Sequence, residues 1–482
     1  MSTPGSNSLR LWAESGSHLL VVQPFMDSLI ERGEGCYLID SDGRRILDLA
    51  AGQFCSILGH RHERFNARLA EQLQAIVHLG DQYVSPGVLK AAERLAGVVP
   101  KPLEKVIFLS TGSEANQCAM RIAKTVTGRS GMLAYTRGYY GISLATRNLS
   151  SISDHDEDRF DFQPAIPGQF KLLTPTCRHC PIQQQQPECN SACLDVSLEM
   201  LGHHAASVAA VIVEPIVSAG GMILPPASYL QELAARTRAM GALFIVDEAQ
   251  TGFGRCGQWF DIQNLGIEPD IMVLSKSAGS GYPASAVVVS GAVARELEAQ
   301  NFSHLSSHQN DPLAAAAVHA VIDIVEAEGL VANSRDVGNY FVDALRKLQA
   351  RHPVISDVRG RGLMIGVELA GDADPFRLVL ACERRGLHLT FSYYEPVVRI
   401  IPPLILSRAE VDVAIGTLDE ALAEMARGGS EWQNDLPQNA RSGPIIKRTS
   451  VDRLTPARVA RKLWNSSPQE WVAAFSRRYG RR

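Results

Sequence analysis

The sequence predicts an α/β protein with a buried parallel β-sheet and two packed domains. Two short apolar runs, Leu243–Val246 and Ile271–Leu274, have the length and composition of strands that are buried on both faces of such a sheet. Asp247 follows the first run directly, and Lys276 follows the second after one serine. In open α/β sheets the chemistry lies just beyond the carboxyl ends of the strands. We therefore expect Asp247 and Lys276 to belong to one site.

These two residue types suit one kind of cofactor chemistry. A lysine at the end of a buried strand is costly unless it is paired or used. In apolar surroundings its amine becomes a nucleophile that forms an imine with an aldehyde. A nearby aspartate can keep a pyridine nitrogen protonated, so that the ring draws electrons from a bound carbon; pyridoxal phosphate chemistry needs this pair. Charged residues also end strands that have no such role, so the neighbouring motifs must decide.

A second motif suits a phosphate group. Residues 105–109 read as a strand, Ser110–Glu114 as a turn of small residues, and residues 114–127 as a helix. The free N–H groups and the positive end of the dipole at a helix N-terminus attract a phosphate. Gly112 lets the chain approach a ligand closely, and Ser113 can cap the helix and donate its hydroxyl. An ordinary helix cap explains the same residues.

Three motifs in this order resemble the class III pyridoxal-phosphate aminotransferases. They are VEPI at 213–216, DEAQTGFGR at 247–255 and SK at 275–276, and the resemblance extends from about residue 20 to about residue 425. Within the family the chain looks most like 2,2-dialkylglycine decarboxylase, whose amino transfer depends on decarboxylation. The resemblance implies fold type I, with a mostly parallel seven-stranded sheet in the large domain and a smaller α/β domain. It also implies pyridoxal 5′-phosphate as cofactor and a homodimer with shared active sites, or a tetramer.

The resemblance assigns roles to individual residues. Lys276 would hold the cofactor, Asp247 its ring nitrogen, and Tyr139 would stack on the ring, although Tyr140 replaces the histidine that the family usually has next. The implied cofactor contacts are Gly112, Ser113, Tyr139, Glu214, Asp247, Gln250, Lys276 and Ser307. Ser307 would reach the phosphate of the partner subunit. In the decarboxylase the loop of Ser307 also helps to bind an alkali cation, for which Asp311 could supply a second oxygen ligand.

Two residues are expected to bind carboxylates of the substrates. Gln53 matches a glutamine that meets the substrate carboxylate, and Arg399 lies in a context, R-I-x-P-P, that resembles the family's carboxylate-binding arginine. We therefore expect an α-amino acid as amino donor and a 2-oxo acid as acceptor. Ala219 stands where the decarboxylase has a serine. The alternatives are decarboxylation-dependent transamination, plain transamination, and racemisation or epimerisation.

Four cysteines lie within 17 residues, in an insertion at about 175–195. The spacings Cys177-x2-Cys180 and Cys189-x3-Cys193 predict a closed zinc site, with His179 as a competing ligand. A loop with reduced cysteines, or a disulfide formed on purification, would fit the same pattern. The short spacers and the QQQQ run favour a loop or a helix start over a sheet.

Composition narrows the function classes. The 482 residues are 45% hydrophobic and 20% charged, which is ordinary for a globular protein, and the net charge of −4 gives no case for general nucleic-acid binding. No apolar run has transmembrane length, and the N-terminus lacks the pattern of a secretory signal. The nine cysteines favour a reduced, cytoplasmic location. A nicotinamide oxidoreductase is disfavoured because no G-x-G-x-x-G follows the first strand of a βαβ unit. A cofactor-binding protein without turnover is disfavoured because Lys276 and Asp247 are both retained.

We predict four parts of the chain: an N-terminal segment (1–60), a large cofactor-binding domain (61–325), a small domain (326–427) and a basic extension (428–482). From residue 431 to the end there are eleven Lys and Arg residues against four Asp and Glu. This extension suits either an RNA-binding or partner-binding tail or a short helical tail packed on the dimer.

Overall fold

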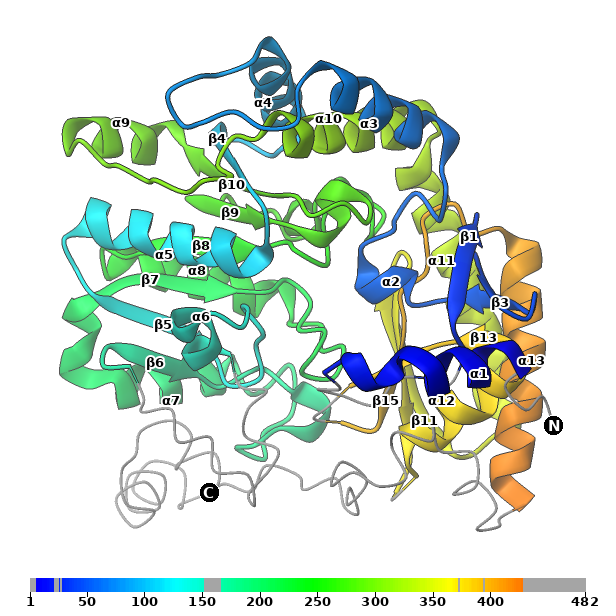
Figure 1. Cartoon of the computed structure of the whole chain (residues 1–482). Coiled ribbons are helices and arrows are strands. Elements are labelled where there is room, and N and C mark those ends of the chain that lie inside the picture. The colour runs from blue at the N-terminus through cyan, green and yellow to red at the C-terminus, as the bar shows by residue number, and fades with distance from the viewer. Residues whose placement is uncertain are drawn as a thin grey trace.

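A seven-stranded sheet forms the centre of the large domain (Figure 1). The computed structural model describes residues 6–20, 26, 28–150, 166–371, 373–392 and 395–427. The strand order is β4-β10-β9-β8-β7-β5-β6, in which β10 is antiparallel to both neighbours and the other neighbouring pairs are parallel. The strands are β4 (Leu103–Leu109), β5 (Gly131–Tyr135), β6 (Gln169–Leu172), β7 (Val208–Val213), β8 (Leu243–Asp247), β9 (Ile271–Leu274) and β10 (Ser285–Ser290). The predicted mostly parallel sheet is confirmed.

Helices cover both faces of this sheet because its strands are apolar on both sides. In β5, Met132 and Ala134 face one layer, whereas Leu133 and Tyr135 face the other. The first layer contains α5 (Gly112–Thr127), α6 (Leu144–Leu149) and α9 (Gly291–Ala299). The second contains α7 (Ala192–Leu201), α8 (Ala227–Ala239) and α10 (Pro312–Ala327), and α3 (Glu63–Ala75) and α4 (Pro86–Val98) pack on α10.

The small domain lies beside the large sheet in Figure 1 and contains an antiparallel sheet of order β11-β12-β15-β14. Its strands are β11 (Ile355–Arg361), β12 (Met364–Leu369), β14 (Thr390–Phe391) and β15 (Val397–Ile400). Its helices are α11 (Leu330–Arg351), α12 (Pro375–Arg384) and α13 (Arg408–Arg427). The close approach of α11 to the β11–β12 turn requires Gly338, since a Cβ there would lie 2.1 Å from the carbonyl oxygen of Gly362.

The N-terminal segment attaches to the small domain. A third sheet has the order β1-β2-β3-β13, and β13 (Leu387–His388) pairs parallel with β3 (Arg45–Asp48). The other strands are β1 (Ile30–Glu34) and β2 (Tyr37–Asp40), and α1 (Ser6–Ser15) precedes them. The short helix α2 (Ala51–Phe54) then leads from this sheet to the large domain. The predicted division of the chain into four parts stays a prediction.

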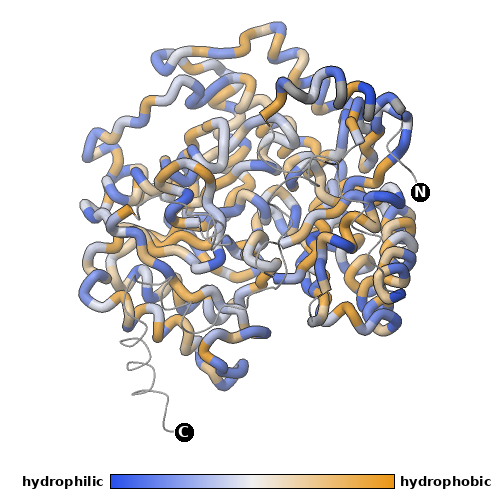
Figure 2. The backbone as a smooth tube through the Cα atoms, turned by 60° about the horizontal axis from the view of Figure 1, so that its bottom comes forward, coloured by the Kyte–Doolittle hydropathy of each residue, from blue (hydrophilic) through white to orange (hydrophobic). Residues whose placement is uncertain are grey.

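Hydrophobic residues concentrate in the strands that run through the middle of the molecule, while the outer helices alternate between hydrophobic and hydrophilic residues (Figure 2). None of the helices in the described ranges combines the length and the apolar character needed to cross a bilayer. The basic extension, 428–482, lies outside the described residues, so neither alternative for it is tested.

Candidate active site

Lys276 and Asp247 lie at the carboxyl ends of neighbouring parallel strands, as predicted. Asp247 ends β8 and is in register with Val273 of β9, and Lys276 opens the short 3-10 helix η6 (Lys276–Gly279) just after β9. Lys276 is half-buried and has a left-handed backbone with φ of 47°. Such a conformation is strained in a non-glycine residue and is typical of functional sites.

Glu214 completes a cluster of charged groups with these two residues. It follows β7, the other neighbour of β8, and is buried. Burial and the nearby charge of Asp247 raise the pKa of Glu214 to about 8, although Lys276 acts in the opposite direction. Burial also raises the pKa of Asp247, and Lys276 again opposes the rise. The amine of Lys276 is therefore within electrostatic reach of both carboxyl groups.

Asn116 fixes the orientation of Asp247. Its Nδ2 donates to Asp247 Oδ2 at 2.7 Å and to the carbonyl of Tyr140 at 2.9 Å, while the N–H of Ala249 donates to Asp247 Oδ1 at 2.9 Å. Asn116 is buried in the second turn of α5. Sequence reasoning missed this residue because its partner lies 131 positions away along the chain.

The turn before α5 has the features of a phosphate site. A Cβ at Gly112 would lie 2.7 Å from Ser275 Oγ, next to Lys276, so this glycine allows the two segments to approach closely. Thr111 rather than Ser113 caps the helix, since its side chain accepts the N–H of Glu114 at 3.3 Å. Ser113 Oγ instead accepts the N–H of Ile142 at 3.0 Å. The predicted cap role of Ser113 is thus wrong, and its hydroxyl joins the turn to the segment that follows Tyr139.

Tyr139 and Tyr140 have different environments. The N–H of Tyr139 donates to Glu214 Oε1 at 2.8 Å, so this half-buried residue lies at the charged cluster. Tyr140 is fully buried, and its hydroxyl donates to the carbonyl of Ile212 in β7 at 3.2 Å. Tyr140, which replaces the family histidine, is therefore held by a hydrogen bond to strand β7 inside the large domain.

Gln250 presents an unsatisfied acceptor near the same edge. It lies three residues after Asp247 and is 7% exposed, and its Oε1 has no hydrogen-bond partner among the described residues. An orphaned acceptor in a buried position is costly unless a ligand supplies a donor. The hydroxyl of a pyridoxal ring is such a donor. Together with the lysine, the buried carboxylates and the phosphate turn, this residue fits the predicted cofactor.

The N-terminal segment brings Gln53 and Phe54 toward Lys276. Helix α2 contacts η6, and three non-glycine residues of α2, Ala51, Gln53 and Phe54, have φ of 45°, 59° and 73°. Gln53 is exposed in the single chain, whereas Phe54 is buried. The guanidinium carbon of Arg399 on β15 lies 4.9 Å from the centroid of the Phe54 ring. Arg399 is 5% exposed, so the predicted carboxylate ligand sits inside the molecule.

Asp48 holds this strained segment and was not predicted. Its carboxylate accepts the N–H groups of Ala50 at 2.9 Å and Gly52 at 3.2 Å, and His60 Nε2 lies 2.9 Å from Oδ2. Burial alone would raise the pKa of Asp48, but the hydrogen bond from His60, the nearby charge of His388 and the N–H of Ala50 lower it overall. The folded chain thus favours the carboxylate form.

Ser307 is exposed on the loop before α10. Its contact with a partner subunit stays a prediction because only one chain is described. Asp311, the second residue suggested for an alkali cation, is engaged by histidines: His78 Nδ1 lies 2.7 Å from Oδ1 and His308 Nδ1 lies 2.5 Å from Oδ2. With both oxygens in these contacts, the structure gives the alkali-cation prediction no support.

The four clustered cysteines lie around one cavity at the edge of the large domain, and all are free thiols. His179 does not join them, because its Nε2 lies 2.7 Å from Glu368 Oε1 of the small domain. The prediction that this segment forms a loop and a helix start is confirmed: η3 (Cys177–His179) contains the first cysteine and α7 the last.

Comparison with known proteins identifies the family of the chain. The family model of class III aminotransferases matches residues 21–422. An uncharacterised aminotransferase of Schizosaccharomyces pombe is 34% identical over 416 residues, covering 84% of this chain and 92% of that protein. An acetylornithine aminotransferase of Archaeoglobus fulgidus is 33% identical over 406 residues, with coverages of 84% and 98%.

A solved structure shows the same fold with its cofactor. It is an amine transaminase from an uncultivated Pseudomonas species with bound pyridoxal phosphate, 30% identical, with a TM-score of 0.76 and coverage of 82% of this chain and 95% of that one. The predicted likeness to the decarboxylase in particular is not supported by these relatives. The chain belongs to the class III aminotransferases, and it is a fold-type I enzyme that depends on pyridoxal 5′-phosphate.

Proposed function

We propose that this enzyme transfers the amino group of an α-amino acid to a 2-oxo acid without loss of CO2. The observation that carries the proposal is the buried guanidinium of Arg399, stacked on Phe54 in the segment that contacts the Lys276 turn. A guanidinium in such a place binds a carboxylate through two parallel hydrogen bonds. An α-amino acid donor would place its amino group near Lys276 and its carboxylate at Arg399, and a 2-oxo acid acceptor would place its keto carbon and its carboxylate in the same way.

Each polar residue of the site has a task in this reaction. Gly112, Ser113 and the N-terminus of α5 would hold the cofactor phosphate, Tyr139 would cover the ring, and Glu214 and Gln250 would face its oxygen side. When bound, pyridoxal phosphate supplies an electron sink for bonds at the substrate α-carbon.

Asp247 and Lys276 would handle the protons. Asp247, held by Asn116, would keep a proton on the ring nitrogen. The Nζ of Lys276 would carry a proton to and from the α-carbon. Gln53, in its left-handed conformation, would face the reacting end of the substrate.

The loop after β7 disfavours decarboxylation. The side chain of Ala219 is a methyl group, and its backbone carbonyl accepts a hydrogen bond from Ser392 Oγ at 2.8 Å. The decarboxylase pattern has a serine hydroxyl at this position to hold the substrate. The missing hydroxyl supports a reaction that removes a proton, not CO2, from the α-carbon.

A substitution of Arg399 tests the substrate class. Truncating one partner of a buried charge pair costs about 2–5 kcal/mol, so in R399A we expect kcat/KM for α-amino acids to fall about 10²-fold or more. Activity on 1-phenylethylamine, which has no carboxylate, should change little. R45A is a matched control, because Arg45 also lies over an aromatic ring, Tyr37 at 4.2 Å, but on β3 away from the site. Equal losses on both amine classes would contradict the assignment.

Decarboxylation is tested with 2-aminoisobutyrate, which has no hydrogen on its α-carbon. With pyruvate as acceptor, we expect neither alanine nor CO2 above the level of a Lys276→Ala control. Release of CO2 at a rate comparable to amino-acid turnover would restore the decarboxylase alternative. A panel of α-amino acids with keto-acid detection identifies the side chain in the same experiment, and chiral analysis of the recovered amino acid detects racemisation.

The same proposal includes a dimer with shared sites. Ser307 is exposed in the single chain, as a residue that contacts a partner's phosphate would be. We expect S307A to weaken pyridoxal phosphate binding about tenfold, the value of one hydrogen bond to a charged group. S306A is the control, because Ser306 Oγ donates to Glu114 Oε1 of its own chain at 2.6 Å. A monomer in sedimentation velocity, or equal binding in both variants, would contradict the shared site.

A further inference from the structure

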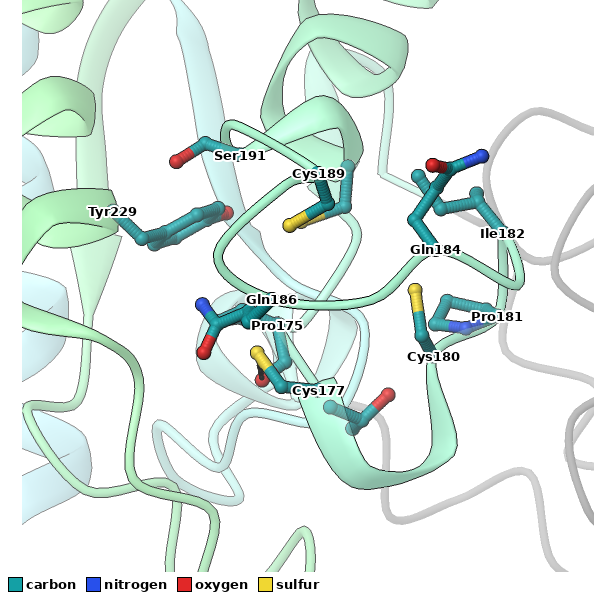
Figure 3. Close-up of a pocket in the computed structure, with 12 residues that line it drawn as sticks. Pro175, Cys177, Cys180, Pro181, Ile182, Gln184, Gln186, Cys189, Ser191 and Tyr229 are labelled. Carbon is teal, nitrogen blue, oxygen red and sulfur yellow. Dashed lines mark hydrogen bonds between the residues drawn. The ribbon is translucent and has the colours of Figure 1, made fainter. Parts of the chain in front are cut away.

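Four thiols enclose a cavity that the aminotransferase site does not use. Figure 3 shows Cys177, Cys180 and Cys189 around this cavity with their sulfur atoms pointing into it, and Cys193 also lines it. The lining is completed on one side by Tyr229 of α8, so the loop is closed against the large domain. Cys193 lies in the first turn of α7, where the positive end of the helix dipole favours a thiolate.

All four cysteines line the same cavity, so their thiols are gathered in one place. Thiols gathered in this way can be held as thiolates by one shared cation, which also offsets the cost of burying them.

Other ligands are absent from this set for a physical reason. The ring of His179 contacts Glu368, and the side chain of Arg178 donates to the carbonyl of Ser356 at 2.9 Å, so the residues between the first two cysteines face the small domain. The residues that line the cavity supply four sulfur donors but no carboxylate or imidazole donor, and this set selects a soft or borderline metal such as zinc over magnesium or calcium.

We propose that Cys177, Cys180, Cys189 and Cys193 bind one zinc ion in a closed tetrathiolate site that fastens the insertion to the small domain. Zinc–sulfur distances of about 2.3 Å place the four sulfurs about 3.8 Å apart. Among the described residues, three potential metal-ligating atoms lie within 4.8 Å of one another at His78, His308 and Asp311. The thiols of the four cysteines do not form such a group. Zinc binding would require the four sulfurs to reach this tetrahedral spacing.

The loop connects to the substrate side of the site through an ion-pair chain. Glu368, which His179 contacts, also accepts from Arg359 Nη1 at 2.6 Å. Arg359 in turn donates to the carbonyls of Gly221 at 2.6 Å and Met222 at 2.9 Å, in the loop that contains Ala219. The zinc site would thus have a structural role at the boundary between the two domains, and four thiolate ligands leave no open position for catalysis.

Metal analysis of the full-length protein tests the proposal. After purification in reducing buffer without chelators, we expect inductively coupled plasma mass spectrometry to find about one zinc ion per chain. C180S/C189S should contain less than about one tenth of that amount. C382S is the control, because Cys382 is buried in α12 of the small domain, far from this loop in sequence. H179A should keep its zinc and thereby exclude His179 as a ligand.

Cobalt gives a readout that is independent of folding yield. Replacement of zinc in the wild type by Co²⁺ should produce the visible d–d bands of a tetrahedral tetrathiolate centre, unchanged in H179A. Zinc should also protect the four thiols from alkylation, and a strong chelator should remove this protection and expose the loop to limited proteolysis. Wild type that holds zinc at background level, with four reactive thiols or with disulfides in its peptide map, would overturn the proposal. These readouts do not depend on the substrate proposed above.

Discussion

Removal of the Asp48 carboxylate should release the strained segment that carries Gln53 and Phe54. Three non-glycine residues there have left-handed backbones, each of which costs about 1–2 kcal/mol. Asp48 offsets this strain by accepting two backbone N–H groups and pairing with His60. In D48A the strain is no longer opposed, and Phe54 no longer supports the guanidinium of Arg399.

The expected magnitude follows from these contacts. Hydrogen bonds to charged groups contribute about 1.5–3 kcal/mol each and are not additive, so D48A should lose about 3–5 kcal/mol of unfolding free energy. D48N keeps Oδ1 for the N–H of Ala50 and should lose about half as much. If about 3 kcal/mol of the loss also affects substrate orientation, kcat/KM for α-amino acids falls about 10²-fold.

The assay combines unfolding with kinetics. D48A, D48N and wild type are compared in urea unfolding and in steady-state transamination of the preferred amino acid. D40A is the matched control, since buried Asp40 also accepts two backbone N–H groups, from Asp42 at 3.0 Å and Arg44 at 2.9 Å, but in a turn outside the site. We expect both variants to lose stability and only D48A to lose kcat/KM. Equal kcat/KM in D48A and D40A would refute the argument.

The pH dependence supplies a second check on Asp48. Its pKa is lower in the folded chain than the ordinary value of about 3.9, so folding favours the deprotonated form. The stabilisation by Asp48 is therefore present above about pH 4 and is lost as the pH falls through the folded pKa. The stability difference between wild type and D48A should shrink as the pH falls through the folded pKa of Asp48.

Three further substitutions test single contacts. N116A removes the donor to Asp247, so kcat/KM should fall about tenfold at neutral pH with little change in KM for the 2-oxo acid. G338A places a methyl group against a backbone carbonyl and should cost more than about 2 kcal/mol, whereas G416A on α13 meets no atom within 4 Å and should gain about 0.5–1 kcal/mol; urea unfolding measures both. E214Q should flatten the apo-enzyme's pH dependence of stability. The raised pKa of Glu214, about 8, means that its contribution is full below about pH 4 and is lost as the pH rises toward 8.

The central strands and the two charged residues at their ends could be predicted because the signal is local. A buried strand in a parallel sheet reads as a short apolar run, and the residue after it lies at the sheet edge in any such fold. Lys276 and Asp247 therefore needed no knowledge of distant parts of the chain. The strand, turn and helix around Gly112 could also be predicted from a local signal. A turn of this type before a helix is typical both of an ordinary helix cap and of a phosphate site.

Residues that act through distant partners escaped prediction. Asn116 looks like any polar residue in a helix until β8 places Asp247 beside it. Asp48 looks like the last residue of a hairpin strand. Its role depends on the unusual backbone of α2 (Ala51–Phe54), which follows two residues later. The assignment of the helix cap to Ser113 was wrong because Thr111 and Ser113 are both suitable cap residues, and only the coordinates show which one precedes the first helical turn.

The distance between the two ends of the site is set by the packing of the domains. Lys276 and Asp247 belong to the large sheet, whereas Arg399 belongs to β15 of the small domain. Arg255, at the end of the DEAQTGFGR motif, is fully buried and donates to the carbonyls of Leu363 and Pro402 in the small domain. Within the described ranges the acceptors of this buried guanidinium are carbonyl groups, which is energetically costly, and burial lowers the pKa of Arg255 to about 10.

The cost of burying the Arg255 guanidinium is compatible with a stable fold because its hydrogen bonds join the large domain to the small domain. An apolar cluster packs at this boundary and includes Phe54, Met222, Cys256 and Val397. Phe54 comes from the N-terminal segment, Met222 and Cys256 from the loops after β7 and β8, and Val397 from the small domain. A shift of the small domain would therefore move Arg399 and Phe54 together while leaving Lys276 and Asp247 in place. In the proposed function, the cofactor end of the site would therefore be fixed by one sheet, and the choice of substrate would depend on the fit between two domains.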